Sequence, residues 1–225
     1  MNRNSHQQLE RTSVRRLIAA GLIFGCALIT ASNAAAQRVT APTTPATIAV
    51  PEGNPAFLLG HAIGTQGYVC LPSGTGASWT VNAARPEAAL FTRIIGQEIQ
   101  IISHFLSPNT NPNEFAPTPL AFANATWQNS LDSSMVWAQA LHSIPAGSDP
   151  SCPNNGAIPC LLLQAIGTQR GPAGGRAMTR TTYVQRLNTD GGSAPADGCL
   201  VSTDVGKQVL VPYTADYYFF RAEKQ

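Results

Sequence analysis

The sequence predicts a single all-β domain, an antiparallel sandwich or a barrel-like fold, stapled by disulfides. Short apolar segments with a period of two recur along the chain, and turns rich in Gly and Pro separate them. Four cysteines follow the N-terminal segment, an even number that suits two disulfides. Many short strands joined by such turns favour a sandwich or barrel over a sheet with alternating helices.

The expected strands span nearly the whole domain. They are 56–62, 67–71, 78–82, 98–105, 134–142, 160–166, 180–187, 208–211 and 216–221. The one helical candidate is 86–91 (PEAALF), where Pro86 stands at a first-turn position with Glu87 behind it. Turn signals include Pro212 and the Gly-rich segment 171–176, which lacks the spacing of a phosphate loop and is expected to be a hairpin loop.

The first 36 residues decide the expected compartment. Arginines, an apolar run over 17–31 and the small residues Ala34, Ala35 and Ala36 follow in the order of a secretory signal, which predicts cleavage after Ala36. The apolar run is shorter than the roughly 20 residues of a membrane-spanning helix. We therefore expect a periplasmic or secreted protein without a transmembrane span. A retained anchor helix and lipidation at Cys26 are the alternatives.

The chain that remains after cleavage is nearly neutral. Residues 1–36 hold four of the 14 Lys and Arg and one of the 12 Asp and Glu, which leaves 10 against 11. No basic patch indicates a nucleic-acid partner. Residues 37–55 are rich in Thr, Pro and Ala, so we expect an extended leader without a helix of its own, followed by the all-β domain at 56–225.

The four remaining cysteines are expected to form disulfides, because an exported protein meets an oxidising compartment. The sequence alone permits three pairings. We favour Cys152 with Cys160, since SCPNNGAIPC can fold into a tight local loop, and Cys70 with Cys199, which would join the first strand to the last turn. A zinc site is the competing interpretation, although neither CxxC nor HxxxH spacing occurs.

The familiar catalytic signatures are missing from the sequence. GxSxG, HExxH and GxxxxGK do not occur, and without GxGxxG no nucleotide cofactor is expected. The candidates for chemistry are His61, in a strand of small residues, and His104, which shares a strand face with Ile102. If the two histidines converged beside Asp132 or Asp216, they could bind a metal or act as acid and base. Histidines on different strands are more often ordinary hydrogen-bonded residues.

Aromatic side chains offer a second candidate surface. On a β scaffold they could present stacking platforms for glycans. The competing interpretation is that they pack in the core. The set comprises Trp79, Trp127, Trp137, Tyr213, Tyr217, Tyr218, Phe219 and Phe220.

Several long blocks resemble one family of secreted microbial proteins. GHAIGTQGYVC, SHFLSPN, TWQNSLDSSMVW, TTYVQRLNTDGGSAPADGC and VPYTADYYFF occur in the order found in the domain of unknown function 3455 family. The resemblance covers nearly all of 56–221, supports the fold and the compartment, and implies no mechanism. The family usually has Trp at position 160, which fits a local extra disulfide at Cys160 in this chain. The positions that match its recurring polar and aromatic pattern are His61, Gln66, Tyr68, Cys70, His104, Trp127 and Asp132.

These features favour an extracytoplasmic ligand-binding or cell-envelope interaction domain over an enzyme. The candidate partner is a glycan or an envelope component, and the candidate ligand-binding residues are Gln66, Tyr68 and Trp127. A metal- or His-dependent secreted enzyme that uses His61 and His104 is the alternative. A purely structural envelope protein is the second alternative.

Overall fold

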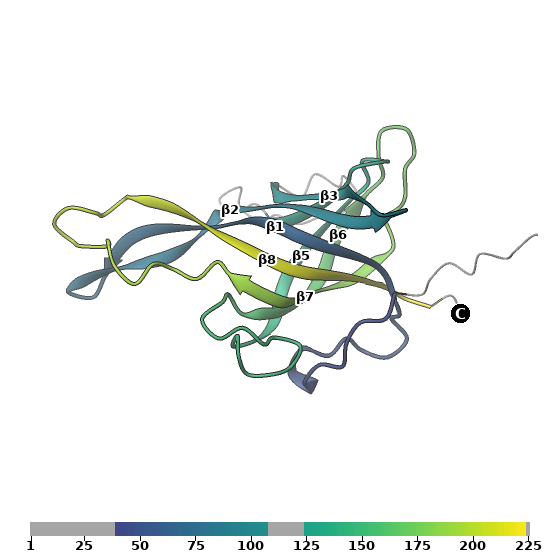
Figure 1. Cartoon of the computed structure of the whole chain (residues 1–225). Helices are drawn as coiled ribbons and strands as arrows, with labels where there is room; N and C mark the ends of the chain where they lie inside the picture. Colours follow the sequence, from purple (N-terminus) through teal and green to yellow (C-terminus); the bar gives the residue numbers. More distant parts are fainter. Residues whose placement is uncertain (1–38, 108–123, 224–225) are drawn as a thin grey trace, which may run out of the picture. The chain divides into compact units, whose positions relative to one another are not determined.

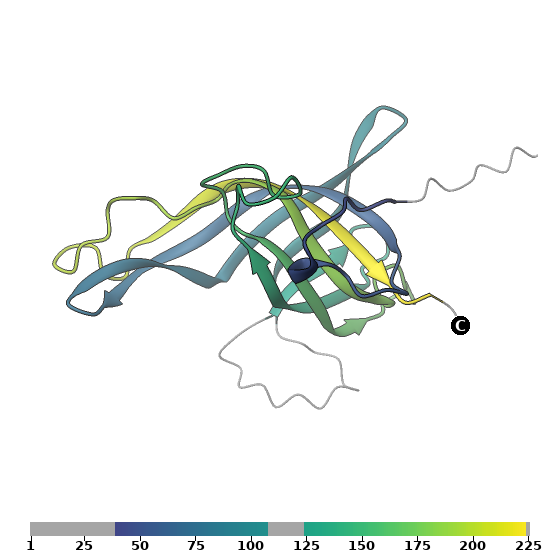
Figure 2. The same cartoon turned by 90° about the horizontal axis from the view of Figure 1, so that it is seen from below.

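The described part of the chain is a closed antiparallel barrel. In this computed structural model the described residues are 39–107 and 124–223, with the backbone alone for 82–86. Each strand pairs with its neighbours in sequence, and β8 closes the barrel by pairing with β1 (Figure 1, Figure 2). The strands are β1 (Ala56–Ser73), β2 (Gly76–Ile94), β3 (Gln97–Ser107), β4 (Asn124–Asn129), β5 (Met135–Ile144), β6 (Cys160–Gln169), β7 (Thr181–Gly191) and β8 (Gln208–Arg221).

The all-β prediction is therefore confirmed, and the barrel is the architecture that the chain adopts. No helix in the ranges 39–107 and 124–223 is long and apolar enough to cross a membrane. The predicted signal at 1–36 lies outside the described residues, so its cleavage stays a prediction.

β1 and β8 are longer than the sequence suggests. β1 is one strand where two are predicted, because the residues between them, 63–66, also pair with β8, and a register shift against β2 follows between Gln66 and Tyr68. β8 continues through Pro212, which is predicted to be a turn. Pro212 lies opposite Thr65 on β1 but beyond Tyr213, the last residue of β8 that pairs with β7, and proline is tolerated where a strand has a partner on one side only.

The predicted helix at 86–91 is wrong, since this segment belongs to β2. Its residues Ala88, Ala89 and Leu90 pair with β1 on one side and with β3 on the other. Sheet partners on both edges outweigh the weak helical preference of so short a segment. The side chain of Leu90 is fully buried in the barrel.

The sequence does not predict β4, whose residues are NATWQN. Only one large apolar side chain, Trp127, marks this strand, and six residues are too few to show a period. In the barrel, β4 lies between β3 and β5 and its pairing partners supply the order that its composition lacks.

Two apolar clusters lie on the two sides of the barrel wall. The inner cluster draws a residue from every strand and includes Ala62, Leu90, Ile102, Trp127, Val136, Leu163, Val184 and Tyr217. The outer cluster lies over β5 to β8 and includes Leu187, Tyr218, Phe220 and both cysteines of one disulfide. Successive residues of β8 therefore alternate between the clusters, as a period of two requires.

The leader completes the outer cluster. It contains a 3-10 turn, η1 (Ala46–Ile48), where the sequence predicts a segment without a helix of its own. Ile48 is fully buried. Gln185 on β7 donates a hydrogen bond of 2.6 Å to the Ile48 carbonyl, which fixes the turn on the barrel.

Both predicted disulfides are confirmed. Cys70 on β1 is bonded to Cys199 in the connection between β7 and β8, and Cys152 is bonded to Cys160 at the start of β6. The first bond staples the long connection onto the ends of β1, β2 and β8, which extend beyond the other strands (Figure 1). The second closes a short loop against the outside of the barrel.

Candidate functional site

Polar side chains that could bind a ligand or take part in catalysis gather at two places on the barrel wall. One group surrounds His61 on the outer face, and the other surrounds His104 on the inner face. The structure does not bring these two histidines together: the His61 side chain is 61% exposed, whereas His104 is 5% exposed. The shared pocket on which a two-histidine site depends is therefore not formed.

His61 is held by a row of hydrogen bonds across three adjacent strands. It lies opposite Asp216 in the pairing of β1 with β8, and its Nδ1 lies 2.6 Å from Asp216 Oδ1. The other carboxylate oxygen accepts a hydrogen bond of 2.7 Å from the Asn188 side chain on β7. Asn188 reaches this position from an irregular stretch of β7, where its φ is 49°.

This row fixes the orientation of the imidazole. Because a carboxylate oxygen only accepts, Nδ1 of His61 carries the hydrogen and Nε2 is left as the outward nitrogen. Asp216 is itself oriented by Asn188, so the ring is held from two strands away. The arrangement presents Nε2 as a hydrogen-bonding or proton-accepting atom at the surface.

A groove runs past His61 on the outer face. It consists of two adjoining hollows of about 380 and 580 Å³, both lined by His61, Thr92 and Arg93. The first is completed by Ile63, Phe91 and Glu98, and the second by Val39, Thr40, Leu58 and Leu59. Arg93 lies 3.8 Å from Glu98, so donor and acceptor groups stand side by side next to apolar surface.

His104 occupies a different environment inside the barrel. Its ring stacks on Trp127, its opposite neighbour on β4, with centroids 4.3 Å apart and planes at 6°. Nδ1 donates to the Thr126 carbonyl at 2.9 Å. Burial lowers the pKa of His104 to about 4. The hydrogen bond to Thr126 raises this pKa, and the positive charge of Arg186 lowers it further. His104 is therefore neutral at pH 7.

Tyrosines extend the inner group. The ring of Tyr217 packs against both His104 and Trp127, at centroid distances of 5.6 and 5.8 Å. Its hydroxyl lies 3.1 Å from that of Tyr213. Burial raises the pKa of Tyr213 well above its ordinary value. Tyr68 donates to the Gly192 carbonyl at 2.6 Å.

Asp132, the predicted carboxylate partner, fastens a loop. Its Oδ1 accepts hydrogen bonds from the backbone and hydroxyl of Ser134, and its Oδ2 accepts one from the Ala177 backbone. Burial alone would raise the pKa of Asp132, but these hydrogen bonds lower it. A Cβ at Gly171 would lie 1.7 Å from the Asp132 carbonyl oxygen, so the loop between β6 and β7 needs glycine there. The predicted hairpin loop at 171–176 is packed against this aspartate.

The predicted ligand-binding residues are all buried. Gln66 is 8%, Tyr68 6% and Trp127 1% exposed, so none of them offers an open stacking surface. Most of the aromatic set packs in the core, and Trp79, which is half-buried, donates to the Asp197 carbonyl.

Sequence reasoning did not single out Asn188, Arg186, Arg93 or Glu98. The sequence analysis does name Asp216 as a possible carboxylate partner of the two histidines, and the structure places Asp216 against His61 but not against His104. Within the part of the chain that the structure describes, no group of three or more His, Cys, Asp or Glu side chains is arranged to hold a metal ion.

Comparison with known proteins identifies a family and nothing narrower. The family described as "Protein of unknown function (DUF3455)" matches residues 51–221, which include the whole barrel. Comparison with curated proteins and with solved structures gives no match. The match covers well over half of the chain, and the chain therefore belongs to the DUF3455 family of proteins of unknown function.

Proposed function

We propose that the chain is an exported binding domain, periplasmic or secreted, which holds a polyhydroxylated ligand such as an envelope glycan in the groove at His61. The observation that carries the proposal is the hydrogen-bonded row from Asn188 through Asp216 to His61. A surface imidazole that is fixed from two further strands is preorganised for a ligand, because its orientation is already determined before binding.

The chemistry of the groove suits a sugar better than an ion. Arg93 supplies donors, Glu98 supplies acceptors, and His61 Nε2 can take either role, which matches hydroxyl groups that donate and accept. Phe91 and Ile63 add apolar surface for the C–H faces of a sugar ring. The charges of Arg93 and Glu98 offset each other, so the groove has no strong preference for a charged ligand.

Titration of the mature protein with defined oligosaccharides, followed by heteronuclear NMR, tests the proposal. We expect binding to perturb residues of β1 and β2 around His61, and His61→Gln and Arg93→Gln each to weaken it about tenfold, the value of one well-placed hydrogen bond. His142→Gln is the matched control, because His142 is an exposed histidine on β5 that does not line the groove. Equal weakening by the control, or perturbations elsewhere on the barrel, would contradict the proposal.

Export is supported by the N-terminal sequence pattern and by the two disulfides. Intact mass of protein recovered from outside the cytoplasm tests it, and we expect a chain that starts at Gln37 and has no free thiol. A retained N-terminus or titratable thiols under denaturing, non-reducing conditions would argue against export.

A His-dependent enzyme is the second candidate, because a carboxylate on Nδ1 is also how a general base is oriented. It would use His61 and Asp216 rather than His61 and His104. Turnover of a bound oligosaccharide that His61→Gln abolishes, with binding retained, would favour this candidate over a pure binding domain.

A further inference from the structure

Arg186 on β7 points into the barrel. It alternates with Gln185 and Leu187, which belong to the outer face, and it shares its own face with Val184 of the inner cluster. On β8 it lies opposite Tyr217, an inner residue. Its charge lowers the pKa values of His104 and Tyr213, as expected for a guanidinium near the inner polar group.

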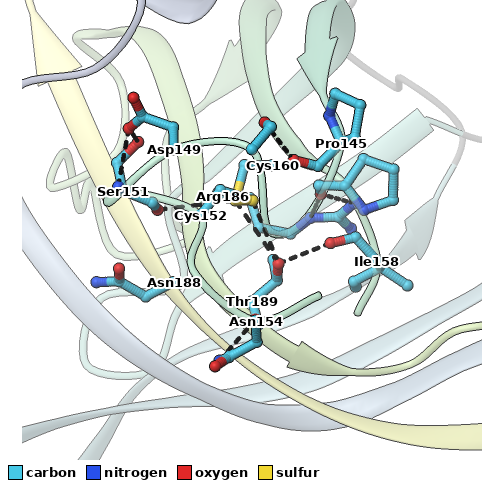
Figure 3. Close-up of a disulfide and its surroundings, with 12 residues drawn as sticks. Pro145, Asp149, Ser151, Cys152, Asn154, Ile158, Cys160, Arg186, Asn188 and Thr189 are labelled. Carbon is cyan, nitrogen blue, oxygen red and sulfur yellow. Dashed lines mark hydrogen bonds between the residues drawn. A yellow bond between two sulfur atoms is a disulfide. The ribbon is translucent and has the colours of Figure 1, made fainter. Parts of the chain in front are cut away.

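The guanidinium is positioned by the short disulfide loop. Its Nε and one terminal nitrogen donate to the Pro159 carbonyl at 3.2 and 2.8 Å. Pro159 precedes Cys160, so the Cys152–Cys160 bond and the hydrogen bond from Thr189 to Ile158 fix this carbonyl. Figure 3 shows the disulfide together with Thr189, Ile158 and Arg186. The side chain is half-buried, which leaves one side open to solvent.

No carboxylate among residues 39–107 and 124–223 forms an ion pair with Arg186. A guanidinium that is partly withdrawn from water usually has such a partner, because a neutral carbonyl only partly replaces its hydration. The inner group therefore carries a positive charge that its described neighbours do not neutralise.

Several N–H and O–H donors in the same region have no described acceptor. The hydroxyls of Tyr213 and Tyr217 are hydrogen-bonded to each other, and this contact uses only one of their two hydrogens. Trp127, which packs against Tyr217, is 1% exposed and its Nε1 has no hydrogen-bond partner. Arg186 offers further N–H groups beyond the two that Pro159 accepts.

We propose that Arg186 and the Tyr213–Tyr217 pair bind the carboxylate of a small organic acid, which enters from the solvent side of Arg186. A carboxylate matches the planar fork of the guanidinium, supplies acceptors for the spare donors and neutralises the charge. The aromatic rings beside it favour a planar acid. This site is separate from the groove at His61, so either one can fail without the other.

Benzoate is the probe that tests this site, and benzamide is its neutral counterpart. In NMR titrations of the mature protein, we expect benzoate to shift the Arg186 Nε–H resonance and benzamide to leave it in place. Arg186→Lys keeps the charge but loses the fork, and we expect at least tenfold weaker binding. Tyr213→Phe removes one hydroxyl with little change in volume, and we expect about threefold to tenfold weaker binding.

Arg170→Gln controls for a general charge effect, because Arg170 is exposed at the end of β6, and it should bind benzoate like the parent protein. The proposal would be overturned by any of three results: no benzoate binding at millimolar concentration, equal binding of benzamide, or equal affinity in the parent, Arg186→Lys and Tyr213→Phe proteins. Since Tyr213→Phe preserves the core volume, the test does not depend on whether the Arg186 variant folds.

Discussion

His61 and His104 lie in the same barrel wall, and the side of the wall decides what each of them can do. His61 faces outward, keeps contact with water and is oriented by a carboxylate, whereas His104 faces inward, stacks on an indole and is neutral. The outer histidine therefore has a nitrogen available to a ligand, and the inner one contributes to packing. The difference follows from strand position, not residue type, because alternate residues of a strand face opposite sides.

Trp127→Ala should have the largest effect, because it removes the inner stacking partner. The indole is almost completely buried, so we expect a loss of about 3–5 kcal/mol in the free energy of unfolding, measured by urea denaturation. Trp79→Ala is the matched control on a half-buried indole and should cost clearly less. Equal costs would show that the inner stack has no special part in stability.

Ile48→Ala tests whether the stability that a side chain contributes depends on its burial or on the side of the barrel wall where it lies. Ile48 packs on the outer face, yet it is fully buried because the leader folds onto the barrel, so we expect a loss of about 2–5 kcal/mol in unfolding free energy. Leu131→Ala, at an 82% exposed position, should change it by less than about 0.5 kcal/mol. A loss below 1 kcal/mol for Ile48→Ala would mean that the leader does not stabilise the domain.

The inner histidine should make the protein sensitive to acid. His104 has a pKa of about 4 when folded and an ordinary value near 6.5 when unfolded. Between these values the unfolded state binds more protons, so the free energy of unfolding should fall with decreasing pH, by up to about 3 kcal/mol below pH 4. His104→Phe keeps an aromatic ring for the stack and should remove this part of the pH dependence in urea denaturation series.

His142→Gln, on the exposed part of β5, should leave the pH dependence unchanged. If the free energy of unfolding of His104→Phe still fell as steeply between pH 6.5 and 4 as that of the parent protein, other groups would account for the acid sensitivity.

The sequence predicts most strands and the Cys152–Cys160 disulfide well because these depend on local signals, whereas the Cys70–Cys199 disulfide joins residues 129 positions apart. Alternation identifies most strands, and SCPNNGAIPC identifies a short disulfide loop. The barrel is harder to predict, since its closure depends on the pairing of β1 with β8, and the His61–Asp216 contact joins residues 155 positions apart. Alternation gives the side of the sheet that a residue faces, but not which strands are neighbours. The helix predicted at 86–91 is wrong because pairing with β1 and β3, which the residues of the segment do not themselves reveal, decided its structure.

Asp216→Asn should have the smallest effect on stability and a clear effect on the outer histidine. The interaction is partly exposed, so we expect a loss of no more than about 1 kcal/mol in unfolding free energy. An amide can offer Nδ1 of His61 either a donor or an acceptor, so the imidazole should no longer be held in the tautomer with hydrogen on Nδ1. Nitrogen NMR of the ring should then show a larger population with hydrogen on Nε2. Asn188→Ala removes only the support of Asp216 and should shift the tautomers less. An unchanged tautomer in Asp216→Asn would show that the row of hydrogen bonds does not orient His61, and the contrast between the two histidines would then reduce to exposure alone.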